Sequence, residues 1–185
     1  MASESRELLL SRAVEHIAGH GVTGLSLRSL AAGIGTSHRM LIYHFGSKDG
    51  LLVAVVRTVE ERQREALATL ELDPAGSLAD TIRAIWRRLA DPTLWPYERL
   101  FFEVYGQALQ GRPGTSALLE GVVDHWLDLN VELGARRGMP AEAARTHARL
   151  GLAVIRGLLL DLLATGDRAG TDAALEAFAA SYRDA

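Results

Sequence analysis

The 185-residue chain has no cysteine, only five prolines and a single lysine. Without cysteine it cannot form a disulfide framework, a thiolate zinc site or a cysteine nucleophile, and it suits a reducing compartment. Its first residues lack the basic and long apolar regions of a signal peptide. The longest apolar stretch, 150–164, contains Arg156 and Asp161 and is shorter than the roughly 20 residues that a bilayer requires. We therefore expect a soluble, cytoplasmic protein without a membrane segment.

Alternating runs of β-branched residues are also missing, whereas apolar residues recur every three or four positions. This spacing predicts an all-α protein of about nine helices and no strand. The expected helices cover about 4–20, 27–33, 37–45, 48–71, 77–90, 94–110, 115–135, 141–165 and 171–183. Ser26, Ser37 and Ser47 are the expected amino-terminal caps of the second, third and fourth helices.

Charge is unevenly distributed along the chain, whose net charge is −3. Residues 1–50 hold five basic and four acidic groups, a balance of +1, while the remainder holds 15 basic and 19 acidic groups, a balance of −4. The amino-terminal third is therefore the part best suited to bind a polyanion. We expect an amino-terminal domain at 1–50 and a second domain at 51–185, with the fourth helix linking them.

Two short helices at about 27–46, joined by Gly33 and Gly35, have the dimensions of a helix-turn-helix. Glycine accepts the positive φ that a tight turn requires. The residues expected to pack inward are Leu30, Ala31, Ile34, Leu41 and Phe45, and those expected to point outward are Thr36, Ser37, His38, Arg39, Ile42 and Tyr43. The outward groups can hydrogen-bond phosphates and base edges, and Ile42 can contact a thymine methyl. The alternative is a helical hairpin with a solvated polar face.

Residues 30–37 (LAAGIGTS), 41–48 (LIYHFGSK) and Leu51 resemble the DNA-binding signature of the TetR family of transcriptional regulators. The resemblance covers about residues 6–60. Two positions depart from it: family members usually have tyrosine at the position of Ile42 and often glycine at that of Arg39. The resemblance implies a homodimer whose variable, all-helical carboxy-terminal domain binds a small ligand and thereby changes the spacing of two recognition helices.

The positions of this sequence that match the family's DNA-binding signature are candidate DNA-binding residues, a role that the resemblance implies. They are Ser26, Arg28, Thr36, Ser37, His38, Tyr43, His44 and Lys48, together with Arg39 on the outward face. Lys48, the only lysine, begins the fourth helix beside Ser47. A helix amino end attracts phosphate through its free N–H groups and dipole, and an ammonium adds a point charge. The alternative for Lys48 is an ordinary solvated side chain.

Seven of the eleven aromatic residues lie within 82–126. Ligand sites in helical bundles are mostly apolar with a few polar groups, so this region is expected to bind a small apolar or aromatic effector. The candidate ligand-binding residues are Trp86, Phe101, Phe102, Tyr105, His125, Trp126 and Arg156. The alternative is that these aromatics fill the core, and that His125 is a hydrogen-bonded core histidine.

The helix expected at 141–165 is apolar nearly all round from 150 to 164. Such a helix needs cover on both faces, and Gly151 and Gly157 would allow close approach of another backbone. With the amphipathic helix at 171–183 it can form a two-fold four-helix interface, so we expect a homodimer through these two helices. The alternative is a central helix of a monomer.

No catalytic, metal or cofactor motif is present. The sequence contains no Glu-x-x-His, His-Glu-x-x-His or Gly-x-Ser-x-Gly. Residues 19–24 match a dinucleotide-binding glycine pattern but follow an expected helix, where that chemistry needs a strand. The sequence thus predicts a ligand-responsive repressor that binds a palindromic double-stranded DNA operator, is not an enzyme and needs no metal or cofactor. Two alternatives are a helical small-molecule-binding protein without operator binding, and an enzyme on a helical bundle.

Overall fold

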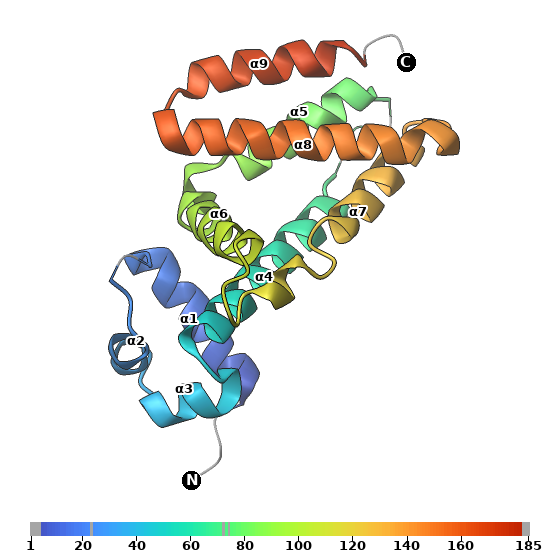
Figure 1. Cartoon of the computed structure of the whole chain (residues 1–185). Coiled ribbons are helices and arrows are strands. Elements are labelled where there is room, and N and C mark those ends of the chain that lie inside the picture. The colour runs from blue at the N-terminus through green and yellow to red at the C-terminus, as the bar shows by residue number, and fades with distance from the viewer. Residues whose placement is uncertain (1–4, 23, 72, 74, 183–185) are drawn as a thin grey trace. The chain divides into compact units, whose positions relative to one another are not determined.

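The computed structural model describes residues 5–22, 24–71, 73 and 75–182. Within these residues it contains nine α-helices, two short 3-10 helices and no strand (Figure 1). The expected all-α fold is therefore confirmed. Residues 4 and 183, where two of the expected helices reach, lie outside the described part. None of the described helices is both long and apolar enough to cross a membrane.

The helices follow in an order close to the expected one. They are α1 Arg6–His20, α2 Leu27–Gly33, α3 His38–Phe45, α4 Lys48–Ala68, α5 Leu78–Leu89, η1 Pro92–Leu94, α6 Trp95–Leu109, η2 Ser116–Leu119, α7 Asp124–Ala135, α8 Ala141–Thr165 and α9 Arg168–Ala180.

Serine hydroxyls begin the second, third and fourth helices, as expected. Ser26 accepts from the backbone N–H of Ser29 in a reciprocal capping box, and Ser37 accepts from that of Met40. Ser47 accepts from the N–H of Gly50 at 3.0 Å. Each cap satisfies a backbone donor that the helix itself leaves unpaired.

Several helix boundaries differ from the expected ones by one to three residues, with α4 ending at Ala68 rather than 71, and two of the differences have a visible cause. The helix expected at 115–135 is interrupted, because Glu120 is extended and Gly121 adopts a φ of +73°. The ring of His125 lies against Gly121, where an added Cβ would stand 2.6 Å from its Cε1 atom. The last helix begins at Arg168 rather than 171, because the Asp167 side chain caps it by accepting from the N–H of Gly170.

The helix-turn-helix turn uses its two glycines differently from expectation. Only Gly35 has a positive φ, of +73°, whereas Gly33 is the last residue of α2. An added Cβ at Gly33 would collide with the ring of His16 from α1. Gly33 is therefore required for close packing of α1 on α2, and not for the turn.

By compactness the chain divides into two units. The first unit comprises Met1–Arg62 and Pro96–Glu120, and the second comprises Gln63–Trp95 and Gly121–Ala185. The functional boundary expected after residue 50 falls inside α4, which runs on to Ala68. The loop that follows α6 thus belongs to the same compact unit as the helix-turn-helix.

In the second unit, α8 and α9 lie side by side, and α7 packs on α8 (Figure 1). Polar contacts join α5 to α9: the Trp86 indole N–H donates to Asp172 at 2.5 Å, and Arg83 donates two hydrogen bonds to Glu176, at 2.7 and 2.6 Å. These contacts hold α9 firmly against α5.

Candidate nucleic-acid interface

The inner faces of α2 and α3 are buried, as their spacing predicts. Leu30 and Leu41 are fully buried. Ala31, Ile34 and Phe45 are between 3% and 9% exposed. The guanidinium of Arg12, on α1, also donates to the carbonyl of Ile34 in the turn. Because one face of α3 is fixed in this way, its opposite face is held outward.

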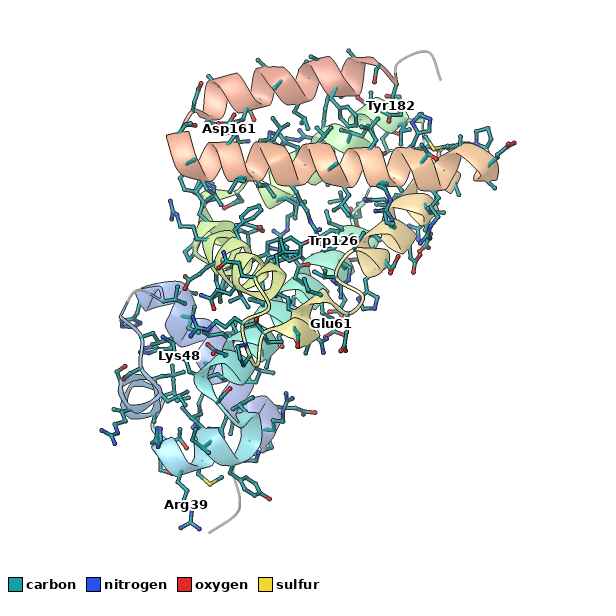
Figure 2. All side chains as sticks on the ribbon, in the orientation of Figure 1. Arg39, Lys48, Glu61, Trp126, Asp161 and Tyr182 are labelled. Carbon is teal, nitrogen blue, oxygen red and sulfur yellow. The ribbon has the colours of Figure 1, made fainter. Side chains whose placement is uncertain are left out.

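The outward face of α3 carries the expected mixture of groups. Tyr43 is 77% exposed and Ile42 is 39% exposed. Ser37, His38 and Arg39 are also exposed, and Thr36 is half-buried. Figure 2 shows the Arg39 side chain extending away from α3. Hydroxyl, imidazole, guanidinium and aliphatic groups thus share one short exposed helix, which suits reading of base edges in a major groove.

His44 is placed differently from the other candidates on α3. Its side chain is half-buried, and its Nε2 atom is buried without a hydrogen-bond partner among the described residues. The ring lies edge-on to Tyr43, with centroids 4.9 Å apart. In this orientation Nε2 cannot reach DNA, so a DNA contact by this nitrogen requires the ring to turn.

Ser26 and Arg28 lie at the start of α2, and both are exposed. The Ser26 hydroxyl is already engaged by the N–H of Ser29 at 3.0 Å and by its hydroxyl at 2.9 Å. A hydroxyl has two acceptor sites and one donor, so any DNA contact by Ser26 would compete with its capping role. The Arg28 guanidinium is the more available group at this end of α2.

The amino end of α4 presents a cation beside an anion. Lys48 is the first residue of α4 and Asp49 is the second. The carboxylate of Asp49 forms an ion pair with Arg112, whose Nε lies 3.2 Å away. Sequence reasoning missed this pair, because nothing in the local pattern links residues 63 positions apart.

Three of the candidate ligand-binding residues lie on α6 in the first unit. The Phe101 ring stacks on Tyr105 and meets Phe102 edge-on, each with centroids 5.3 Å apart. Phe101 is buried, whereas Phe102 and Tyr105 are half-buried. The structure thus brings these three aromatic rings into one cluster.

The other four candidates lie in the second unit. Trp86 and Trp126 are buried, and the Arg64 guanidinium lies 5.8 Å from the centre of the Trp126 ring. Arg156 donates to the carbonyl of Val122 at 2.9 Å. His125 is exposed, so the alternative of a core histidine is wrong. The indole N–H of Trp86 donates to Asp172, and the Arg168 guanidinium lies 5.9 Å from the centre of its ring, so Trp86 is a core side chain in this structure.

Comparison with known proteins agrees with this geometry. The model of bacterial regulatory proteins of the tetR family matches residues 9–55, which span α1, α2, α3 and the start of α4. The transcriptional repressor NicS of Pseudomonas putida is 27% identical over 160 residues, covering 82% of this chain and 74% of NicS. Residues 9–55 are thus similar to the DNA-binding part of tetR-family regulators, and most of the chain is similar to curated transcriptional regulators.

Solved structures support the same fold along the whole chain. A transcriptional regulator from Rhodococcus sp. Rha1 superposes with a TM-score of 0.76 at 21% identity, covering 96% of this chain and 95% of that one. The multidrug binding protein EbrR, complexed with proflavin, gives a TM-score of 0.67 at 26% identity, covering 93% of this chain and 96% of that one. The likeness therefore extends well beyond the helix-turn-helix.

Proposed function

We propose that this protein is a transcriptional repressor of the TetR family that binds a palindromic DNA operator as a homodimer and responds to a small apolar or aromatic effector. The observation that carries the proposal is the outward face of α3, where Arg39, Ile42 and Tyr43 are exposed while Leu41 and Phe45 are buried. Large side chains such as Ile42 and Tyr43, exposed next to each other among polar groups on a short helix, are typical of a binding surface. A major groove covers such a helix and pairs its polar groups. The operator lies in the cytoplasm, so the expected cytoplasmic location forms part of the proposal.

The exposed face of α8 supports the dimer. Leu150 is 49% exposed and Leu160 is 52% exposed. Ala153, Gly157, Asp161 and Ala164 are exposed on the same face, and nothing lies within 4 Å of a Cβ added at Gly157. A mainly apolar stripe of this length on a single chain fits a two-fold contact with the same helix of a second copy.

The effector part of the proposal is supported by the aromatic cluster on α6 and by the similarity to EbrR, which is named a multidrug binding protein. An effector changes operator affinity only if it binds the DNA-competent and incompetent states unequally, with couplings of typically about 1 to 3 kcal/mol. Tryptophan fluorescence during ligand titration, repeated with and without operator, would measure that coupling. Ligands that quench fluorescence without changing operator affinity would support a small-molecule-binding protein without a switch.

The decisive experiment is selection of bound duplexes from a random pool, followed by footprinting and measurement of molecular mass in solution. We expect a dimer and a recovered palindrome whose half-sites lie about one helical turn apart, roughly 34 to 36 Å, or a multiple of it. One three-helix head reads too few base pairs for useful specificity. A monomer that protects no specific site would contradict the proposal.

A further inference from the structure

The loop after α6 is attached to the beginning of α4 within the first compact unit. Arg112 pairs with Asp49 at 3.2 Å. Gly114, at a φ of +85°, lies so close that an added Cβ would stand 3.4 Å from the Cβ of Asp49 and 3.7 Å from the Oγ of Ser47. The loop backbone therefore reaches the cap and the first turn of α4, beside Lys48.

Further contacts fix this loop on both sides of Gly114. The hydroxyl of Thr115, which is 1% exposed, donates to the carbonyl of Arg112 at 2.8 Å. The guanidinium of Arg57 on α4 donates to the carbonyl of Ala117 and lies 3.6 Å from Glu120. Because the backbone around Arg112 is anchored in this way, its guanidinium is held near Asp49 without relying on the ion pair alone.

The charge of Asp49 has opposite consequences for folding and for DNA binding. A carboxylate in the first helical turn is stabilised by the helix dipole. The same carboxylate, adjacent in sequence to Lys48, would repel a phosphate that approaches the amino end of α4. Its side chain is 20% exposed, so solvent screens it only in part. A compensating cation removes this conflict while keeping the favourable first-turn carboxylate.

We propose that Arg112 is a positioning residue for DNA binding: it neutralises Asp49, so that the net charge at the amino end of α4 stays positive and Lys48 can hold a DNA phosphate. This inference rests on the proposed DNA-binding function. According to this inference, the loop after α6, which lies outside the helix-turn-helix, affects the affinity of the protein for duplex DNA. The effect is electrostatic, so it acts on specific and non-specific duplexes alike.

The test compares Arg112→Gln, Arg112→Lys, Asp49→Asn and the Arg112→Gln/Asp49→Asn double variant with the unaltered protein. Arg136→Gln is the matched control, because Arg136 is 52% exposed against 51% for Arg112 and pairs with Glu132 at the carboxyl end of α7, in the second unit. Arg112→Gln and Arg136→Gln each remove one positive charge. The readouts are the dissociation constants for the selected operator and for a random duplex, measured across about 50 to 300 mM salt, together with the unfolding midpoint.

Arg112→Gln should weaken binding to both duplexes by about threefold to tenfold at low salt, and the loss should shrink as salt rises. Arg112→Lys and the double variant should restore near-original affinity, while Arg136→Gln should have little effect. A loss that Asp49→Asn fails to relieve, or that persists at high salt with a lowered unfolding midpoint, would overturn the inference. If the unaltered protein retains no duplex, the proposed function fails instead. If the unaltered protein binds duplex DNA but Arg112→Gln and Arg136→Gln affect its affinity equally, only this inference fails.

Discussion

At the scale of single residues, Lys48 combines three features that favour a phosphate contact. It is the only lysine of the chain, it begins α4, and the Ser47 hydroxyl beside it caps that helix. The remaining free N–H groups of the first turn and the helix dipole add to the attraction for an anion. An ammonium on a flexible stem contacts phosphate as a point charge and carries little base specificity.

Lys48→Ala should weaken binding to every duplex by a similar factor. Each lost phosphate contact releases roughly one counterion fewer, so the slope of log affinity against log salt should decrease by about two units for a dimer. Affinity measured over a salt series for the operator and a random duplex checks this. Arg136→Ala, which removes the cation of the Arg136–Glu132 ion pair at the carboxyl end of α7, serves as control. An unchanged slope in Lys48→Ala would show that Lys48 does not contact phosphate.

Residue-scale features were predictable from sequence where their causes are local. The serine caps depend on a hydroxyl and a backbone donor three residues away, and the burial of Leu41 and Phe45 follows from their spacing on one helical turn. The pair of Asp49 with Arg112 and the burial of Nε2 of His44 depend on the folded chain. Neither has a local sequence signal, so neither could be predicted.

At the scale of helices, apolar periodicity predicts the number and type of elements but not every boundary. The helix expected at 115–135 is interrupted because Gly121 adopts a left-handed conformation, and periodicity carries no information about that backbone angle. The role of Gly33 illustrates the same limit. A glycine between two helices suggests a turn, whereas here it makes room for the ring of His16, which also stacks on His20 at 4.2 Å.

Gly33→Ala should destabilise the protein by about 1 to 3 kcal/mol, because the added Cβ displaces the His16 ring from its packed position. In a His16→Ala background the same change should be neutral or slightly stabilising. Gly106→Ala is the matched control: Gly106 lies within α6 with nothing within 4 Å of an added Cβ, so alanine should stabilise by about 0.5 to 1 kcal/mol. Denaturant unfolding of the four variants checks this. If Gly33→Ala lowers the unfolding midpoint by the same amount in the original and in the His16→Ala background, the packing argument is wrong.

At the scale of the whole molecule, the proposed operator binding requires a second copy of the chain. A single recognition helix discriminates only a few base pairs. When two copies are joined by a two-fold axis, binding of one head to its half-site places the other head near the second half-site, so the dimer binds a palindrome more tightly than either head alone. In α8, Leu152, Leu159 and Leu162 pack inward, while Leu150 and Leu160 remain about half exposed. The helix thus has two apolar faces, of which the chain covers only one.

Leu160→Glu should convert the dimer to a monomer, because a carboxylate buried between two copies loses its hydration without gaining a partner. Palindrome affinity should fall on the order of tenfold or more, since the two heads are no longer linked, while affinity for a single half-site should change little. Leu109→Glu is the matched control, because Leu109 is 64% exposed on α6 in the first unit. Light scattering and duplex titration check both variants. A Leu160→Glu protein that stays dimeric, or a monomer that keeps full palindrome affinity, would show that this face of α8 does not join the two copies that read the operator.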